Sequence, residues 1–537
     1  MKRKVTLLLL VLSVGLFLRV YDLGTESLWA DEGLSVATVS GNFVEMKNRL
    51  TRSIHPPLYY LVLHGWTRLF GTSEVAVRFP SVLFGLISIL LAYNIGKELF
   101  SQNVGLLTSL MVAISPFHIR YAQEARNYSL LFMLSLISLF YFIKMLKKDS
   151  WQTTILYSIS SLLLIYTHVY GLFTILTYNV YVILRKTILS KDHTPSLTHW
   201  LFAQCLLVLP FLPWINVIIH HVLHRQRSGS WQVAPSLFTL GASFFVYAGS
   251  LPLLILCTVS LGAVFVYCQQ LRLRESGDRL WTSLRAWRNT LSEPRLEPLY
   301  LLFFWFFCHN ILPLLLSNVL TPFYRFRYTI AASLTLYLIV SKAILRLPKQ
   351  KTWAVAFISL YCLFSLFSLR FYYQEVNKER WREVAHYIDD HAAPEDLVIV
   401  NAANLLTDNL NYYSKRHDLT QIGFPSVTQF WQRIPPGDLK KPFESTVQAY
   451  KRVWVVFSHT NYYADLIQTT LNSTHTLTDH RKYHSISYNA GKKYLGIELL
   501  RFDKMPKLAL PYSEQQNVGN QPAAPPVIPA NSQREKS

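Results

Sequence analysis

The sequence YSLLFMLSLISLFYFIKML fills residues 128–146 and contains one charged side chain, Lys144. A helix of this length measures roughly 30 Å, which matches the hydrocarbon core of a bilayer. In that core every backbone N–H and C=O group must be bonded within the chain, so a spanning segment has to be helical. We therefore predict that residues 128–146 form a transmembrane helix.

Similar apolar runs recur along the chain between short polar loops. They cover residues 5–20, 76–96, 104–118, 151–167, 169–185, 198–217, 237–268, 298–318, 326–345 and 352–370. Of the 537 residues, 51% are hydrophobic and 15% are charged, whereas about 25% are charged in a soluble protein. The sequence thus predicts an α-helical polytopic membrane protein with about eleven transmembrane helices.

Three segments suggest helices that lie along the membrane surface. Residues 33–50 and 56–70 are amphipathic, and the second is short and holds a histidine, a tryptophan and an arginine. Such a helix is expected at the interface instead of across the bilayer. The run 237–268 is long and contains Gly249 and Pro252. We predict that it begins as an interfacial helix and then crosses.

The distribution of positive charge predicts the orientation. The formal net charge of +21 would suggest nucleic-acid binding in a soluble chain, but much of this charge lies in alternate loops between the predicted spans. Six arginines, for example, lie between Arg272 and Arg295. Basic loops of membrane proteins stay in the cytoplasm. We expect a multi-pass protein of the plasma (inner) membrane with a cytoplasmic N-terminus and no nucleic-acid partner.

After the last span the chain becomes polar. Predicted helices and strands alternate here, as in the helix 381–390 and the strand 397–400, which indicates a small α/β domain over residues 374–505. The orientation above makes this domain extracytoplasmic. Residues 506–537 are rich in Pro, Asn, Gln and Ala, and we expect a disordered tail. Residues 1–373 form the predicted transmembrane domain.

Polar residues in the predicted outer loops suggest chemistry at the membrane surface. Asp31 and Glu32 follow the first span, and adjacent carboxylates can act as a general base and its helper, or bind a metal. The same pair would suit the N-terminus of a helix, where acidic side chains favour the dipole. His55 precedes two prolines and could bind a metal or carry a proton. It could equally be a solvated histidine beside a helix start.

Two more outer loops combine ionisable and aromatic residues. The sequence YAQEARNY at 121–128 holds Glu124 and Arg126 among tyrosines. Ionisable residues at the ends of membrane helices are costly to bury and tend to be functional. The alternative is an interfacial aromatic belt with a local salt bridge. His168 lies in a short turn, YTHVYG, at 166–171.

A third loop, PFYRFRY at residues 322–328, carries two arginines and two tyrosines. Guanidinium groups bind phosphate through paired hydrogen bonds, so this loop suits a phosphate held at the membrane surface. Arginines are unexpected on the outer face without such a ligand. The alternative is side chains that extend along apolar surface to reach water.

Four motifs follow one another in the first part of the chain: WADE at 29–32, HPPL at 55–58, RFPS at 78–81 and QEARNYSL at 123–130. This order resembles the polytopic membrane glycosyltransferases of the GT-C superfamily. It is most similar to the protein O-mannosyltransferase and lipid A aminoarabinose transferase group, including bacterial members of glycosyltransferase family 39. The resemblance is strong over residues 1–190 and looser to about residue 400.

The resemblance implies transfer of a sugar from a polyprenyl-phosphate donor, a membrane lipid, to a protein, lipid or glycan acceptor outside the cytoplasm. Asp31 would be the general base for a single inverting displacement, Glu32 would help to position it, and Glu124 would be a further catalytic acidic residue. The implied substrate-binding residues are Arg126, Tyr128, His168, Tyr324, Arg325, Arg327 and Tyr328. His55 could hold a divalent metal, although the aminoarabinose transferases carry a different residue before the two prolines.

Two other functions would suit a polytopic chain. A lipid or sugar transporter would need polar residues near mid-membrane and paired repeats, and neither is evident in the sequence. A non-enzymatic subunit for polysaccharide assembly or export would use the outer domain for docking. Its function should survive the change Asp31→Asn, which should abolish sugar transfer.

Overall fold

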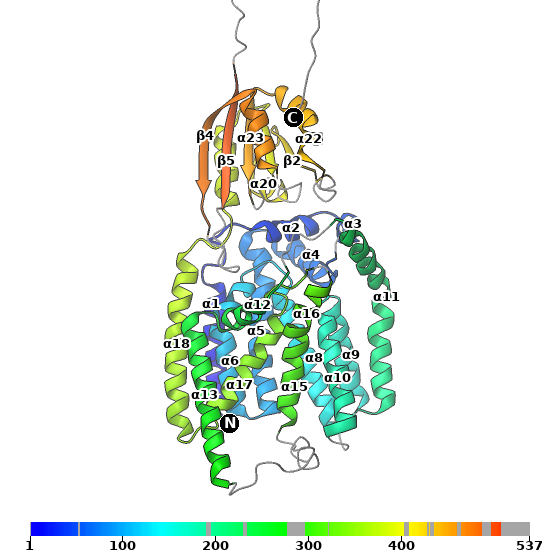
Figure 1. Ribbon diagram of the computed structural model, residues 1–537, viewed down its shortest axis with the longest axis vertical. Helices are drawn as coiled ribbons and strands as arrows, with labels where there is room; N and C mark the ends of the chain where they lie inside the picture. Colours follow the sequence, from blue (N-terminus) through cyan, green and yellow to red (C-terminus); the bar gives the residue numbers. More distant parts are fainter. Residues whose placement is uncertain are drawn as a thin grey trace, which may run out of the picture.

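A tall helical bundle carries a small sheet domain at one end, and the N-terminus lies at the other end (Figure 1). The computed structural model describes residues 2–51, 54–189, 195–228, 234–275, 296–320, 322–401, 407–426, 429, 434–458, 463–485 and 496–505. The predicted disordered tail, 506–537, lies outside the described residues.

The bundle is built from the predicted apolar runs, each of which is wholly or mainly helical. Its helices are α1 (Lys2–Val20), α5 (Glu74–Leu99), α6 (Gln102–Ile114), α7 (Pro116–Ala122), α8 (Tyr128–Lys147), α9 (Trp151–Ile165), α10 (Gly171–Leu184), α11 (Leu197–Ser228), α12 (Leu237–Ala248), α13 (Leu251–Glu275), α15 (Glu297–Phe306), the π-helical turn η2 (Phe307–Ile311), α16 (Leu312–Val319), the short 3₁₀ turn η3 (Ile330–Ala332), α17 (Ser333–Ile344) and α18 (Gln350–Gln374). The π turn η1 (Arg185–Leu189) extends α10.

The predicted count of about eleven spans is met only in part. By length and composition, five helical stretches of the described chain can cross a membrane, or seven if each of two bent helix pairs is one span. The other predicted runs do not meet the length or composition expected of a membrane-spanning helix. α1 carries basic residues at both ends, and α9 and α17 have only 15 and 12 residues. A 15-residue helix reaches roughly 23 Å.

The two bent pairs meet at their breaks. α6 and α7 bend by 60° at Pro116, and α12 and α13 bend by 98° at Gly249. Gly249 has φ of +95°, and a Cβ there would lie 2.8 Å from the Pro116 ring. Only glycine suits both that backbone and that contact. The predicted division of 237–268 into two differently directed helices is confirmed.

Three short helices separate the bundle from the sheet domain (Figure 1). They are α2 (Ala30–Ser40), α3 (Phe43–Thr51) and α4 (Leu58–Phe70); α2 and α3 overlap the predicted amphipathic stretch 33–50, and α4 lies within the stretch 56–70. Their inner faces bury Met46 and Leu63, whereas Phe43 and Leu69 are exposed. This pattern fits helices that lie at a membrane interface.

The sheet domain, which is named the outer domain after its predicted side of the membrane, is a five-stranded sheet in the order β2-β1-β3-β5-β4. Its strands are β1 (Leu397–Asn401), β2 (Thr420–Phe424), β3 (Arg452–Phe457), β4 (His475–Tyr483) and β5 (Ile497–Lys504), and its helices are α19 (Trp381–His391), α20 (Thr407–Tyr413), α22 (Pro436–Gln448) and α23 (Ala464–Asn472). β1 is parallel to both neighbours, and β5 is antiparallel to β3 and β4. The apolar strands β1 and β3 are covered on both faces, as their continuous hydrophobic runs require.

The outer domain is fastened to the segment that leads into α2. The hydroxyl of Tyr413 accepts a hydrogen bond from the Leu28 N–H at 2.7 Å, and Asn409 Nδ2 donates to the Leu28 carbonyl at 3.2 Å. Ser27 Oγ donates to the Glu379 carbonyl at 2.6 Å. The segment just before the WADE motif is therefore held by residues of the outer domain.

Candidate active site

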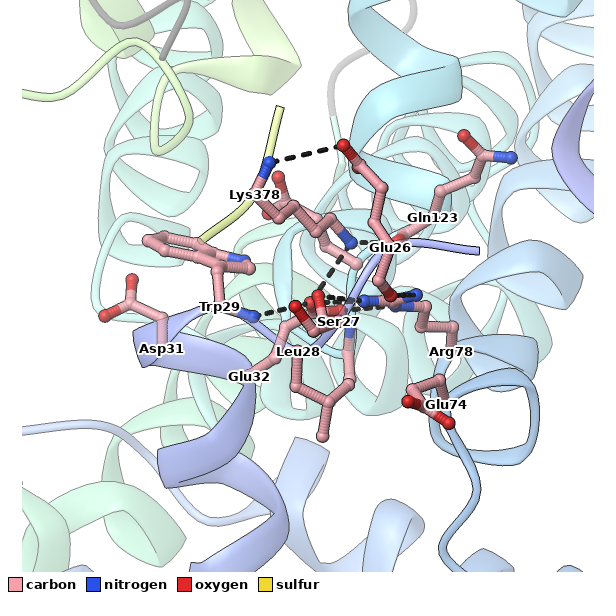
Figure 2. Close-up of polar contacts among 12 residues, drawn as sticks. Glu26, Ser27, Leu28, Trp29, Asp31, Glu32, Glu74, Arg78, Gln123 and Lys378 are labelled. Carbon is pink, nitrogen blue, oxygen red and sulfur yellow. Dashed lines mark hydrogen bonds and ion pairs between the residues drawn. The ribbon is translucent and has the colours of Figure 1, made fainter. Parts of the chain in front are cut away.

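Asp31 and Glu32 share the first turn of α2, but their side chains point away from each other (Figure 2). Glu32 is fully buried, whereas 29% of the Asp31 side chain is exposed. Neighbouring residues on a helix are about 100° apart, so only one of two adjacent side chains can face the core here. The pair therefore consists of one interior and one accessible carboxylate.

Glu32 is the centre of a buried ion cluster. It accepts hydrogen bonds from Arg78 Nε and Nη2, both at 2.9 Å, from Lys378 Nζ at 3.1 Å and from the Ala125 N–H at 2.7 Å. Burial by itself would raise the pKa of Glu32, but the two cations and these hydrogen bonds outweigh it and lower the pKa to about 2. Glu32 is thus built to stay ionised.

The cluster ties three loops together. Arg78 also donates to the carbonyls of Leu23 and Ser27 at 2.8 and 3.0 Å, and Lys378 donates to the Gln123 carbonyl at 2.9 Å. Lys378 comes from the linker between α18 and α19. Glu32 therefore holds the WADE loop, the QEARNY loop and the base of the outer domain in one arrangement.

Asp31 faces two arginines from distant loops. Its carboxylate lies 3.2 Å from Arg327 Nη2 and 3.9 Å from Arg126 Nη2. Arg126 Nη1 also donates to the Asp31 carbonyl at 3.1 Å and to Ser35 Oγ at 2.9 Å. Two guanidinium groups thus surround one carboxylate, which leaves one positive charge in excess at this point.

Aromatic rings fix the guanidinium of Arg327. Its carbon lies 5.4 Å from the ring centres of Trp29 and Tyr128 and 5.5 Å from that of Tyr328. Cations are attracted to the faces of such rings. The structure therefore brings together Asp31 with Arg126, Arg327 and two of the predicted tyrosines.

Glu124 occupies a separate position. It is 3% exposed and pairs with Arg120 at 3.6 Å. Burial raises the pKa of Glu124, although Arg120 and Lys378 oppose the effect. This carboxyl group therefore holds a proton more readily than Glu32 does.

Comparisons with known proteins place this geometry in a family context. The model of the dolichyl-phosphate-mannose-protein mannosyltransferase family matches residues 54–215. The structure is similar to ArnT from Cupriavidus metallidurans bound to undecaprenyl phosphate, with a TM-score of 0.56 and 13% identity over 92% of this chain and 97% of that chain. The chain has the GT-C fold. The predicted resemblance to mannosyltransferases and aminoarabinose transferases is confirmed.

Two further relatives are more distant or shorter. The GT-C fold also extends to the oligosaccharyltransferase AglB from Archaeoglobus fulgidus, in complex with an inhibitory peptide and a dolichol-phosphate. The TM-score is 0.53, at 10% identity over 95% of this chain and 75% of that chain. In sequence, an uncharacterized protein from Aquifex aeolicus (strain VF5) is 29% identical over 139 residues. That match covers 24% of this chain and 28% of the relative.

The two predicted histidines, His55 and His168, lie near each other. The Tyr170 N–H donates to His168 Nδ1 at 3.1 Å, and the His168 ring lies 4.7 Å from that of Tyr328. Burial lowers the pKa of His168 well below its usual range, and nearby His55 adds to the effect. Within the described ranges, no group of three or more His, Cys, Asp or Glu side chains could hold a metal ion. A metal at His55 stays a prediction, and we derive no step through it.

The loop 322–328 divides its side chains between two directions. Arg327 and Tyr328 face the Asp31 cluster, whereas the Tyr324 hydroxyl donates to Asn310 within the bundle. Arg325 is half-buried. Of the four predicted residues of this loop, Tyr324 is thus directed away from the Asp31 carboxylate.

Sequence reasoning gave no role to three residues that shape the site, Trp29, Arg78 and Lys378. The first two lie inside motifs that mark the GT-C resemblance, so the motifs themselves contained the signal. Lys378 lies in a polar linker with no local pattern. Only the folded chain shows that its ammonium group reaches Glu32.

Proposed function

We propose that this protein transfers a sugar from a polyprenyl-phosphate carrier to an acceptor at the outer face of the membrane, with Asp31 as general base. The observation that carries the proposal is the contact of Asp31 with Arg327 and Arg126 at 3.2 and 3.9 Å. This contact joins a partly exposed carboxylate to two arginines that can bind an anion. The similarity to proteins that bind undecaprenyl phosphate and dolichol-phosphate supports a lipid-linked donor.

The chemistry is one displacement. Asp31 takes the proton of the acceptor hydroxyl, whose oxygen forms a bond to the anomeric carbon. The bond from that carbon to the phosphate oxygen breaks, and its electron pair stays on the lipid phosphate. The configuration at the anomeric carbon is inverted. Arg126 and Arg327 stabilise the charge that develops on this leaving group.

The charges of the site fit this donor. Arg126 and Arg327 carry two positive charges and Asp31 carries one negative charge, so one positive charge is left for a phosphodiester. The aromatic rings around Arg327 leave its guanidinium in one orientation, which suits paired hydrogen bonds to a phosphate. The same arginines hold the Asp31 carboxylate in place through ion pairs.

The orientation of the chain belongs to the proposal. The N-terminus and the sheet domain lie at opposite ends of the bundle (Figure 1). The ends of α8 and α18 that lie away from the sheet carry Lys144, Lys147 and Lys351. The positive-inside tendency assigns that end to the cytoplasm and the sheet domain to the outside.

The test is sugar transfer by the purified protein. Radiolabelled polyprenyl-phosphate hexose, pentose and amino-sugar donors are incubated with an added membrane extract. We expect label to move from one donor class to an acceptor, and we expect Asp31→Asn to stop this. The control Asp390→Asn removes the same charge from an exposed position on α19. Uptake of label into protein-containing vesicles without a change in its chemical form would favour a transporter and contradict the proposal.

A further inference from the structure

The candidate span Glu297–Val319 is not a regular helix. At its middle one π turn, η2 (Phe307–Ile311), separates α15 from α16. Pro313 follows in the first turn of α16. Proline has no backbone N–H, so it cannot donate the usual helical hydrogen bond to the carbonyl four residues earlier. Single π turns inside helices are frequent at functional sites.

This turn places two polar side chains inside the bundle. His309 and Asn310 are 2% and 0% exposed. Polar side chains are costly inside a membrane segment and are generally kept there for a function. Neither residue touches Asp31 or its two arginines in the described contacts, so any role in transfer has to be indirect.

Asn310 connects the π turn to the arginine loop. Its Oδ1 accepts a hydrogen bond from the Tyr324 hydroxyl, and its Nδ2 donates to Ser243 Oγ on α12 at 2.9 Å. Tyr324 comes three residues before Arg327 and is 7% exposed. The amide is thus bonded at both ends and fixes the start of the loop that carries Arg327.

His309 connects the same turn to the His168 turn. Its Nδ1–H donates to the Trp305 carbonyl at 2.8 Å, so its Nε2 accepts from the Thr174 hydroxyl, at 2.7 Å. Thr174 lies in the first turn of α10, directly after residues 166–170. Both hydrogen-bonding positions of the imidazole are therefore used in its neutral form.

The two anchored loops then meet. The Tyr170 hydroxyl donates to the Phe323 carbonyl at 3.4 Å, and the rings of Tyr170 and Tyr328 are 5.4 Å apart. Arg327 lies between Tyr328 and the Asp31 carboxylate. One turn inside the bundle thus fastens both segments that border the anion-binding pair.

We infer that Asn310 is a positioning residue which, through the Tyr324 hydroxyl, holds the loop 322–328 so that Arg327 faces Asp31 and is ready to bind the donor phosphate. His309, through the Thr174 hydroxyl, holds the facing turn at residues 166–170 in place. The effect on donor binding rests on the proposed function, whereas the effect on the loop does not.

The first measurement is hydrogen exchange of the full-length protein in nanodiscs, read by mass spectrometry. Phe323 and Tyr328 have bonded amides, to Ser317 Oγ and to the Arg325 carbonyl. We expect Asn310→Leu and the milder Tyr324→Phe to raise exchange of the peptide 322–329 about tenfold, because each removes a buried hydrogen bond. The control is Asn318→Leu, which removes an amide that, among the described residues, bonds only the carbonyl of Leu314 on the same helix. Wild-type exchange in both test variants would overturn the inference.

The second measurement is the affinity for undecaprenyl phosphate. We expect Asn310→Leu and Tyr324→Phe to weaken binding about tenfold, with the melting temperature of Tyr324→Phe near that of wild type. In an Arg327→Ala background Asn310→Leu should have no further effect, since it acts through Arg327. An equal loss in both backgrounds would overturn the positioning role.

The two measurements separate the two claims. If the loop exchanges faster in the variants but the wild-type protein does not bind undecaprenyl phosphate, the loop-positioning role stands and the proposed donor is wrong. If wild type binds the lipid and both test variants bind it equally well, the donor stands and the positioning role is wrong.

Discussion

The guanidinium of Arg327 lies 3.2 Å from the carboxylate of Asp31, although Asp31 comes near the start of the membrane domain and Arg327 comes near its end. The contact brings the start of α2 and the α16–α17 connection together. In the proposed displacement, the carboxylate acts where the new bond forms and the guanidinium acts where the old bond breaks. The predictions below follow from this pair and from the buried cluster behind it.

Asp31→Asn should lower the turnover of sugar transfer by about 10²- to 10⁴-fold, the contribution expected from a general base. The amide has nearly the same shape, so expression, membrane insertion and melting temperature should match wild type. The measurement is label transferred per unit of purified protein. Transfer at more than a tenth of the wild-type rate would show that another group takes the proton.

Arg327→Lys should weaken binding of undecaprenyl phosphate about tenfold or more. Lysine keeps the charge but loses the two-pronged geometry and the fit between the aromatic rings. Arg126→Lys should have a similar effect, because Arg126 also fixes the Asp31 carbonyl. Titration of the lipid into the detergent-solubilised protein measures this.

The control for these variants is Arg68→Lys, at an arginine on α4 that bonds only the Gly41 carbonyl in the described contacts. It should leave affinity unchanged. If all three variants lost affinity for the lipid equally, replacing any arginine by lysine would explain the result, and the anion site at Arg327 and Arg126 would not be supported.

The sequence predicted which loops contribute the ionisable residues of the candidate site, because buried charge in a membrane protein is rare enough to stand out. Asp31, Arg126 and Arg327 were all recognisable from motif order and residue type. The sequence could not show that Glu32 faces inward while Asp31 faces the arginines. That choice depends on Arg78 and Lys378, which lie far along the chain and meet only after folding.

The span count is confirmed only in part, for a related reason. Apolar runs are visible in the sequence, but a π turn, the 60° bend between α6 and α7 and helices of 12 to 15 residues are set by packing against neighbours. The direction of Tyr324 was equally hidden, since its partner Asn310 lies inside a run that the sequence predicts only as a transmembrane helix. Pro252 and Gly249 did allow the α12–α13 bend to be predicted.

Glu32→Gln should destabilise the protein by about 3–5 kcal/mol, since it leaves Arg78 and Lys378 buried without a counter-charge. Differential scanning fluorimetry in detergent should show a clearly lower melting temperature. The matched control is Glu74→Gln, at a carboxylate whose partner Arg382 is partly exposed. That change should cost about 1 kcal/mol or less. A wild-type melting temperature for Glu32→Gln would show that the ion cluster is not what holds the loops.

The same carboxylate predicts an acid limit to stability. The pKa of Glu32 is lowered to about 2 in the folded chain, from an ordinary value of 4.5. Because the pKa of Glu32 is lower in the folded chain than in the unfolded chain, ionised Glu32 stabilises the fold at pH values above 4.5. This stabilisation is lost as the pH falls toward the pKa of the folded chain. This corresponds to about 3 kcal/mol lost between roughly pH 5 and pH 2. Wild type should therefore lose more stability than Glu32→Gln over this range, in melting curves measured at stepped pH. Parallel losses would contradict the assignment.

Gly33→Ala tests how the outer domain fixes α2. A Cβ at position 33 would lie 2.1 Å from Asn409 Oδ1, and Asn409 is fully buried while bonded to the Leu28 carbonyl. The amide cannot move aside without breaking that bond, so we expect a loss of about 1–3 kcal/mol in stability. Transfer should fall as well, because Asp31 lies on the same turn of α2.

The double variant Gly33→Ala with Asn409→Ala separates this clash from a backbone effect. Removing the amide leaves room for the new methyl group, so the double variant should melt higher than Gly33→Ala alone. Gly65→Ala is the matched control, since a Cβ there on α4 meets no atom within 4 Å and alanine favours a helix interior. It should be neutral or stabilising by about 0.5–1 kcal/mol. If the double variant is no more stable than Gly33→Ala, the outer domain does not press on α2 at this point.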